Sequence, residues 1–258
     1  MKKMLWVLWI GAACSIFGGC RSSQKALCGK VVLGSHAAVT PVSRDANWWM
    51  SRHLSVLDQV KQGNPEVIFI GDSITHGWEN KGKEIWQPYY AKYNAINMGF
   101  SGDLTEHVLW RLENGQVDGI SPKAAVLMIG TNNAARNQYT PEQIADGIRA
   151  IVCTLRSKLP QTKVLILAIF PRGSDEQRKD KTQDAAYNPL WAKNDTVNRM
   201  ISKFADGKTI FYLDINKAFL NDQGVLTREV MPDLLHPEKK GYALWAQAME
   251  PTLVKLLK

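Results

Sequence analysis

The sequence offers few residues for a metal site or for a disulfide framework. It contains four cysteines and five histidines in 258 residues, and it has neither a His-Glu-x-x-His pattern nor cysteine pairs at zinc-ligand spacing. Only Cys28 and Cys153 remain for a disulfide once the N-terminal segment is set aside, so no disulfide framework is predicted. Cys153 lies in an apolar helical pattern, where we expect a buried free thiol that packs as a small hydrophobe. We therefore expect no metal site.

Charge of one sign is not concentrated anywhere in the chain. The 32 Lys and Arg exceed the 24 Asp and Glu, which makes the formal net charge +8. The basic residues are scattered among acidic ones, whereas nucleic-acid-binding proteins gather theirs on one face or stripe. Nucleic-acid binding is therefore not expected.

The N-terminal apolar run is too short to span a membrane permanently. It extends from Met4 to Phe17, about 14 residues, whereas a spanning helix needs about 20. Lys2 and Lys3 precede the run, and small residues end it, which is typical of a secretory signal peptide over residues 1–19. We expect export followed by cleavage.

The residues around Cys20 indicate how the exported protein is held. The small residues before Cys20 resemble the bacterial lipobox, in which this cysteine becomes the lipidated first residue, although Phe17 stands where leucine is usual. This resemblance implies a protein anchored by lipid in the envelope of a bacterium. The alternative is ordinary cleavage nearby, which would make the protein periplasmic or secreted.

The rest of the chain is long enough for one sizeable core. Residues 20–46 mix Ser, Gly, Ala and Lys without a strong period, which favours a tether. The folded domain is expected over residues 47–258.

Within this domain, short apolar runs alternate with amphipathic helical patterns. The predicted strands are 66–71, 94–98, 124–129, 163–169 and 209–213. The predicted helices are 48–60, 104–114, 141–158, 190–204 and 238–257. Such alternation is typical of βαβ units, in which helices cover both faces of a parallel sheet. The sequence therefore predicts an α/β fold, a three-layer α/β/α domain with five parallel strands, whose ligand crevice lies at the carboxyl ends of the strands.

Four motifs fall at this crevice. They are Gly71–Ser73, Gly99–Asp103 and Gly130–Asn133 after the first three strands, and Asp233–Pro237 before the last helix. Each motif alone is compatible with an ordinary turn or helix cap. A serine in the crevice together with a histidine beside a carboxylate, however, suggests a nucleophile and its base.

Together the four motifs resemble those of the SGNH or GDSL hydrolase family. Further segments narrow the resemblance to the catalytic subunits of intracellular platelet-activating-factor acetylhydrolases: Trp49–Ser51, His107–Gly115, Pro171–Gly173 and Gly241-Tyr242. The resemblance spans residues 47–256, and it implies a flavodoxin-like fold and chemistry without a cofactor. Such relatives dimerise, so a homodimer is one expectation.

The resemblance also implies roles for five residues. Ser73 would be the nucleophile, His236 the base that takes its proton, and Asp233 the carboxylate that orients the imidazole. The backbone N–H groups of Ser73 and Gly102 and the side-chain amide of Asn132 would form an oxyanion hole. All five positions carry the residue types that the family requires.

Other polar residues near the crevice are expected in supporting roles. His76 is predicted to line the crevice or the surface, and His107 to be packed or to cap a helix. Asp72 is expected to organise the turn that carries Ser73. His36 and His53 are expected outside the crevice.

The substrate is predicted from export and from the resemblance. We expect a serine esterase that removes small acyl groups, O-acetyl above all, from glycans or related esters at the cell surface. The alternatives are a phospholipid acetylhydrolase, a lysophospholipase or a thioesterase and, outside enzymes, a carbohydrate-binding lipoprotein. Trp78 and Trp191 are candidates to line the pocket. The long polar loop 171–190 either shapes substrate entry or is simply solvated.

Overall fold

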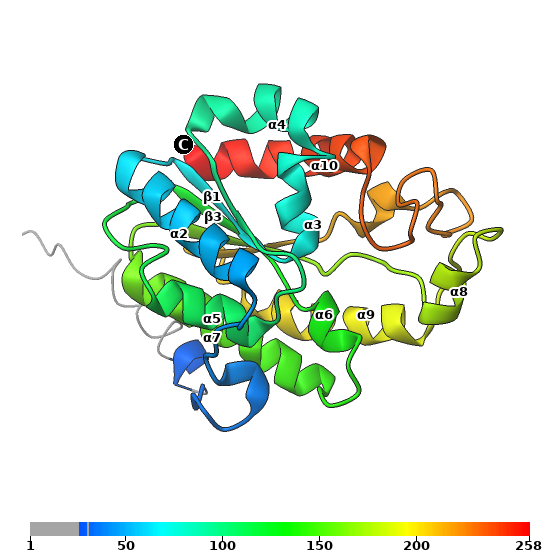
Figure 1. Cartoon of the computed structure of the whole chain (residues 1–258), viewed down its shortest axis with the longest axis horizontal. Helices are drawn as coiled ribbons and strands as arrows, with labels where there is room; N and C mark the ends of the chain where they lie inside the picture. The colour runs from blue at the N-terminus through cyan, green and yellow to red at the C-terminus, as the bar shows by residue number, and fades with distance from the viewer. Residues whose placement is uncertain (1–25, 30) are drawn as a thin grey trace, which may run out of the picture.

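The computed structural model describes residues 26–29 and 31–258, and its centre is a sheet of five parallel strands (Figure 1). The strands are β1 (Val67–Gly71), β2 (Ile96–Gly99), β3 (Ala124–Met128), β4 (Lys163–Leu167) and β5 (Ile210–Leu213). They lie in the order β2-β1-β3-β4-β5. The predicted strands and the flavodoxin-like α/β class are confirmed, with small differences at the strand ends.

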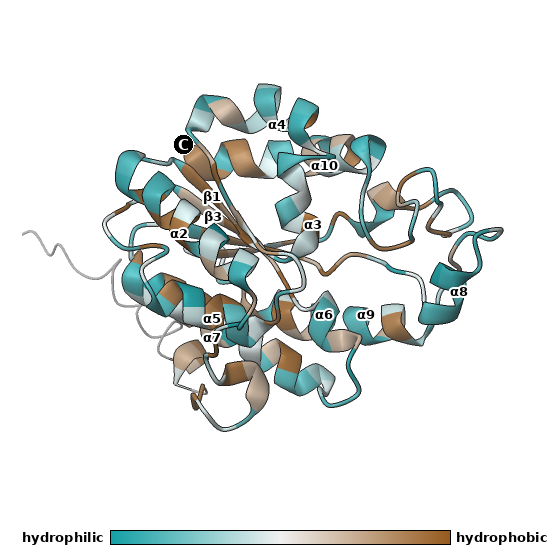
Figure 2. Cartoon of the chain, viewed as in Figure 1, coloured by the Kyte–Doolittle hydropathy of each residue, from teal (hydrophilic) through white to brown (hydrophobic). Residues whose placement is uncertain are grey.

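The side chains of the strands alternate between two apolar cores, as a pleated strand requires. Ile68 and Ile70 of β1 enter one core, whereas Val67 and Phe69 enter the other. Both faces of the sheet must therefore be covered by helices. Figure 2 shows the apolar strands inside and hydrophilic residues on the outer sides of the helices.

Two helical layers provide this cover. One layer comprises α2 (Asn47–Gln62), α5 (Thr105–Glu113), α7 (Pro141–Lys158) and α9 (Pro189–Ile201). The other comprises α4 (Lys83–Tyr90) and α10 (Lys239–Leu257), which lie together at the top of Figure 1. The sequence patterns predict all of these helices except α4.

Short helices complete the architecture. The short α-helices near the site are α3 (Ser73–His76), α6 (Thr131–Ala134) and α8 (Asp175–Lys179). The 3-10 turns are η1 (Ala37–Val39), η2 (Gly77–Glu79), η3 (Ala91–Tyr93), η4 (Ser202–Phe204) and η5 (Asn216–Phe219). In the part of the chain that the structure describes, no helix is both long and apolar enough to cross a membrane.

Cys153 is not the free thiol that its apolar surroundings predict. It forms a disulfide with Cys28, and the two Cα atoms lie 5.6 Å apart. Cys153 is only half-buried, because it stands at the edge of the apolar face of α7, where the N-terminal segment crosses the helix. The two cysteines are 125 residues apart in the sequence, so the local pattern around either one does not reveal that they pair.

The described part of the predicted tether is packed onto the domain, which corrects that expectation. Ala38 and Val39 are buried in the core beside α5 and α7. Thr105 donates its hydroxyl hydrogen to the Ala38 carbonyl over 2.9 Å, and a Cβ at Gly147 would lie 2.7 Å from the same oxygen. The folded body therefore reaches back at least to Cys28. The predicted signal peptide and Cys20 lie outside the described residues.

Candidate active site

The turn after β1 places Ser73 at the start of α3. The Asp72 carboxylate caps this helix by accepting the backbone N–H of Ile74 over 3.0 Å. A Cβ at Gly71 would lie 2.4 Å from the carbonyl oxygen of Met128, so only glycine lets β1 pass this close to β3. The role that the sequence predicts for Asp72, organising the turn, is confirmed.

Ser73, His236 and Asp233 form a continuous chain of hydrogen bonds. Ser73 Oγ lies 2.8 Å from His236 Nε2, and His236 Nδ1 lies 2.7 Å from Asp233 Oδ2. Since a carboxylate can only accept, the imidazole carries its proton on Nδ1 and accepts the serine hydroxyl at Nε2. This is the arrangement in which an imidazole can take a proton from a serine that attacks an electrophile.

A tight turn brings Asp233 and His236 together. Asp233 Oδ1 accepts the backbone N–H groups of Leu235 and His236 over 3.0 and 2.7 Å. Leu234 has a φ of +56°, and its carbonyl accepts the N–H of Gly173 over 2.8 Å. Burial opposes ionisation of Asp233, but the hydrogen bonds from His236 and the nearby positive charges hold the pKa of Asp233 well below its usual range. The carboxylate is therefore ionised at neutral pH.

The loops after β2 and β3 bring Gly102 and Asn132 beside each other. Gly102 adopts a φ of +77°, which favours glycine because it lacks a Cβ. Asn132 Nδ2 donates one hydrogen to the carbonyl oxygen of Asp103 over 3.0 Å, and the amide carries a second hydrogen. Next to them, Ser101 Oγ lies 3.0 Å from Nδ1 of His76 on α3, so these loops adjoin the helix that begins with Ser73.

A buried carboxylate anchors the Gly102 loop from below. Asp103 accepts hydrogen bonds from Trp49 Nε1 over 2.7 Å and from Arg111 Nε over 2.9 Å, and Arg44 lies 3.5 Å away. Burial raises the pKa of Asp103, although Arg111 and Trp49 oppose this shift. Sequence reasoning assigns no role to these partners, but Trp49 and Arg111 stand in two of the segments that carry the family resemblance.

Asp72 is fully buried beneath the turn. Burial raises the pKa of Asp72 to about 7, although the hydrogen bond from the Ile74 N–H works in the opposite direction. Its Oδ2 atom makes no hydrogen bond within the described residues. The side chain faces the interior, and its Oδ1 accepts a backbone N–H of α3.

The remaining histidines of the domain lie as the sequence predicts. His76 lines the same pocket as Ser73. His107 Nδ1 accepts the backbone N–H of Leu104 over 3.0 Å and so caps α5, and burial with nearby arginines lowers its pKa to about 3. His53 stacks on Trp49 in the core, with ring centroids 6.1 Å apart.

The two tryptophans expected to line the Ser73 pocket do not do so. Trp78 is 1% exposed, and its ring packs against Tyr242 and Trp245 with centroid separations of 4.5 and 5.0 Å. The turn η2 directs this ring inward because the apolar face of α10 lies beneath it. Trp191 is 5% exposed and lines a different cavity.

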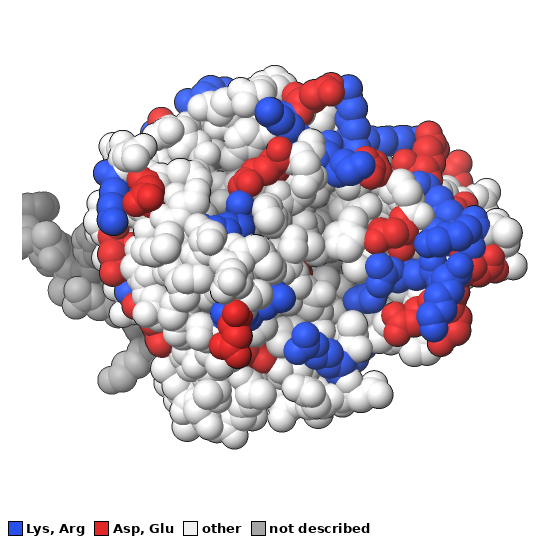
Figure 3. Space-filling model, viewed as in Figure 1, with Lys and Arg blue, Asp and Glu red and all other residues white. Residues whose placement is uncertain are grey.

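Arg178 is a site residue that the sequence patterns do not reveal. From α8 it donates Nε–H to the Asp233 carbonyl over 3.0 Å and Nη2–H to the Asp233 carboxylate over 3.1 Å. Its neighbours are charged, and the segment looks like a solvated charge run. Figure 3 shows basic and acidic side chains gathered at the end of the molecule where Figure 1 places α8.

A second arginine fixes the loop that carries Arg178. Arg228 donates Nε–H to the Gln183 carbonyl over 2.8 Å, Nη2–H to the Gln177 carbonyl over 2.7 Å and Nη1–H to the Pro232 carbonyl over 2.6 Å. Because Pro232 directly precedes Asp233, Arg228 joins the loop 171–190 to the histidine turn, which the loop also contacts through Gly173 and Arg178. It is not simply solvated.

Comparison with known proteins places this site in a family. The family model described as the GDSL-like lipase/acylhydrolase family matches residues 69–244. The chain therefore belongs to the GDSL-like lipase/acylhydrolase family. It is a serine hydrolase that acts on carboxylic ester bonds, as the motifs predict.

Relatives of known name extend over most of the chain. Platelet-activating factor acetylhydrolase IB subunit alpha1 of Homo sapiens is 36% identical over 220 residues, which cover 85% of this chain and 88% of that protein. Subunit alpha2 of Rattus norvegicus is 35% identical over 213 residues, which cover 81% and 85%. The resemblance inferred from the motifs is thus confirmed.

Solved structures share the fold. A GDSL-like lipase from Bacteroides thetaiotaomicron superimposes with a TM-score of 0.64 at 20% identity, covering 80% of this chain and 97% of that one. An acetylxylan esterase from Geobacillus stearothermophilus superimposes with a TM-score of 0.56 at 18% identity, covering 76% and 94%. At these identities the likeness concerns the fold alone.

Proposed function

We propose that the protein is an exported esterase that removes small acyl groups, chiefly O-acetyl, from glycans. Ser73 attacks the ester carbonyl while His236 takes its proton, and Asp233 stabilises the imidazolium that forms. The N–H groups of Ser73 and Gly102 and the amide of Asn132 stabilise the oxyanion. His236 then protonates the leaving alcohol, and water releases the acyl group by the same steps. No step requires a cofactor.

The observation that carries this proposal is the character of the pocket at Ser73. The pocket has a volume of about 370 Å³ and includes Ser73 and His236. Its other lining residues are polar or small, apart from Tyr242 and two prolines, and no Leu, Ile, Val, Met or Phe is among the described residues that line it. Lys81 and Glu238 form an ion pair of 2.7 Å at its edge. A long acyl chain would find no apolar channel here, whereas a short acyl group on a polar alcohol fits.

The names of the relatives support acetyl as the acyl group that the enzyme removes. The 36% identical human relative is named as an acetylhydrolase of platelet-activating factor, which makes a phospholipid acetylhydrolase the second candidate. The predicted signal peptide favours a glycan as the alcohol, because it would direct the enzyme to the cell surface.

The disulfide supports export, because disulfides persist in oxidising compartments and are rare in the cytosol. Cys28 and Cys153 are bonded, and both lie after the predicted signal peptide. We propose that the protein resides in the bacterial cell envelope, held by lipid on Cys20.

The test is an acetate-release screen with the purified protein. Substrates are acetylated xylan, acetylated pectin, O-acetylated sialic acid and platelet-activating factor, together with p-nitrophenyl acetate and p-nitrophenyl palmitate. We expect acetate from at least one glycan and faster cleavage of the acetate than of the palmitate. Release from platelet-activating factor alone would establish the second candidate, and faster cleavage of the palmitate would favour a lysophospholipase or thioesterase.

Arg178 gives a prediction about the orientation of the catalytic groups. Replacing Arg178 by alanine removes a charge-assisted hydrogen bond to the Asp233 carboxylate, of about 1.5 kcal/mol, so kcat should fall roughly tenfold. KM should change little, because Arg178 does not line the Ser73 pocket. Steady-state kinetics with p-nitrophenyl acetate measures both constants.

Two further variants make this result specific. Arg178→Lys retains the charge and should have a higher kcat than Arg178→Ala. Lys179→Ala, on the same helix, should have the kcat and KM of the wild type. A rise in KM at constant kcat would contradict a positioning role and would assign Arg178 to substrate binding.

A further inference from the structure

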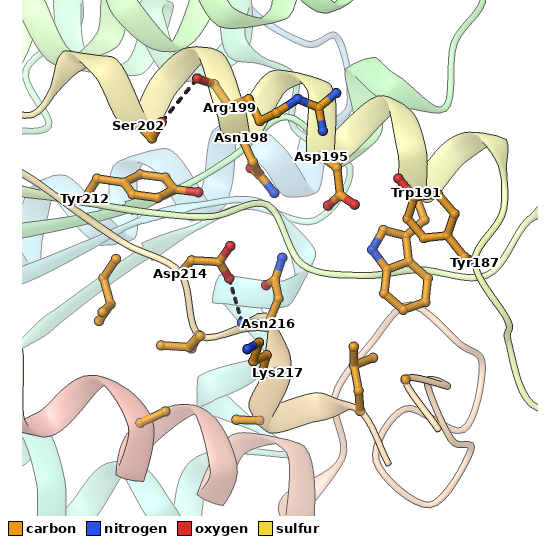
Figure 4. Close-up of a pocket in the computed structure, with 16 residues that line it drawn as sticks. Tyr187, Trp191, Asp195, Asn198, Arg199, Ser202, Tyr212, Asp214, Asn216 and Lys217 are labelled. Carbon is orange, nitrogen blue, oxygen red and sulfur yellow. Dashed lines mark hydrogen bonds between the residues drawn. The ribbon is translucent and has the colours of Figure 1, made fainter. Parts of the chain in front are cut away.

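A second cavity lies beside β5, away from Ser73 and His236. It has a volume of about 1020 Å³ and is bounded by α9, by the end of β5 and by η5 (Figure 4). Asp214, which follows β5 directly, is part of its wall. Because the strands are parallel, this cavity lies at the same carboxyl edge of the sheet as Ser73. The steps proposed for ester hydrolysis make no use of it.

Aromatic rings form one wall of this cavity. Tyr187 and Trp191 contact each other with ring centroids 5.3 Å apart, and Tyr212 lies on the opposite side in Figure 4. Tyr187 is 59% exposed, although burying a ring of this size is strongly favourable. Burial and the nearby Asp195 carboxylate raise the pKa of the Tyr187 hydroxyl, so this exposed ring stands beside a carboxylate of the cavity wall.

The polar groups of the cavity balance in charge. Asp195 and Asp214 face it together with Arg199 and Lys217, so it offers hydrogen-bond acceptors and donors without net charge. Asn216 adds a buried side-chain oxygen, Oδ1, that has no hydrogen-bond partner within the described residues. A buried acceptor without a partner is costly, and a donor on a ligand would satisfy it. A cavity of this kind has little preference for anions or for cations.

We propose that the cavity is a binding site for neutral sugar residues of a glycan. Sugar rings present apolar C–H faces that pack on aromatic rings, and their hydroxyls both donate and accept hydrogen bonds. Tyr187 and Trp191 supply the faces, and the balanced polar groups supply the partners. A phosphate would need an excess of positive charge, which this cavity lacks.

The segment 171–190 connects the cavity with the active site. It carries Arg178, which contacts Asp233, and Tyr187, which borders the cavity. Gln177, next to Arg178, is linked to Ala186, next to Tyr187, because its Nε2–H donates to the Ala186 carbonyl over 3.1 Å. A glycan held at the cavity would therefore lie beside the segment that borders the triad. This binding does not depend on hydrolysis, so it can be tested separately from the proposed function.

The experiment measures binding to the purified Ser73→Ala variant by isothermal titration calorimetry. The probes are xylohexaose, cellohexaose and mannohexaose, with polygalacturonate as an anionic probe and choline as a cationic one. We expect at least one neutral oligosaccharide to bind. Adding Tyr187→Ala should weaken that binding roughly 2- to 10-fold, whereas Tyr89→Ala, a change of a half-buried tyrosine outside the cavity, should leave it unchanged.

Further measurements keep the proposal falsifiable. The Ser73→Ala background has almost no turnover to compare, so Tyr187→Ala is also made in the active enzyme, where turnover of p-nitrophenyl acetate should equal that of the parent. Lys217→Ala provides a second change at the cavity and should weaken the same probe. The proposal is overturned if no neutral oligosaccharide binds, or if Tyr187→Ala and Lys217→Ala both leave the affinity unchanged. It is also overturned if only choline or polygalacturonate binds and Tyr187→Ala weakens that binding.

Discussion

Replacing Ser73 by alanine is expected to lower kcat for p-nitrophenyl acetate by about 10⁴- to 10⁶-fold. The reason is that His236 would retain its hydrogen bond to Asp233 but would have no hydroxyl to deprotonate. Stability should change little, because the helix that begins at Ser73 is capped by Asp72. Initial rates and thermal melting of the purified variant measure the two effects.

Two controls accompany this variant. Ser55→Ala makes the same chemical change at an exposed position of α2 and should keep full activity. A fluorophosphonate probe should label the wild type but not Ser73→Ala. Residual activity above a hundredth of the wild type would show that another group performs the attack, and an unlabelled wild type that binds glycans would favour the non-enzymatic lipoprotein.

Breaking the disulfide is expected to cause the largest change in stability. The bond between Cys28 and Cys153 closes a loop of 125 residues, for which the loss of unfolded-state entropy corresponds to a free energy of unfolding of up to about 5 kcal/mol. Urea titration of the oxidised and reduced protein should show a lower midpoint after reduction. The double variant Cys28→Ala/Cys153→Ala should resemble the reduced protein.

Activity serves as the control for this second prediction. Neither cysteine lines the pocket at Ser73, so the reduced protein should hydrolyse p-nitrophenyl acetate at the native rate well below its melting temperature. A midpoint that does not move on reduction would show that packing of Ala38 and Val39 alone holds the N-terminal segment.

Most of the fold is predictable because its signals are local. Each strand is a short apolar run, and α7 has Thr140 as its N-cap, whose hydroxyl accepts the N–H of Gln143 over 3.2 Å. Pro141 follows in the first turn. The helix α4 is missed because its sequence includes Pro88, which normally interrupts a helix.

The candidate site is predictable where it rests on motifs and unpredictable where it rests on packing. Ser73, His236 and Asp233 fall in short motifs at the crevice, and the structure brings them together. Trp78 follows the same turn, yet its ring points into the core, because the direction of a side chain depends on the helix that packs beneath it. Arg178 stands 55 residues before Asp233, and only the tertiary fold reveals their contact.

The link between Cys28 and Cys153 also defines how the enzyme would be presented at a membrane. With the lipid on Cys20, as proposed, about eight residues separate the anchor from the first point fixed to the domain, and they span at most about 28 Å. Cys153 lies in the C-terminal half of α7, which leads into β4 and so sits toward the amino ends of the strands. This short segment would hold the amino ends of the strands close to the lipid surface. Ser73, at the carboxyl ends, would then face away from the membrane.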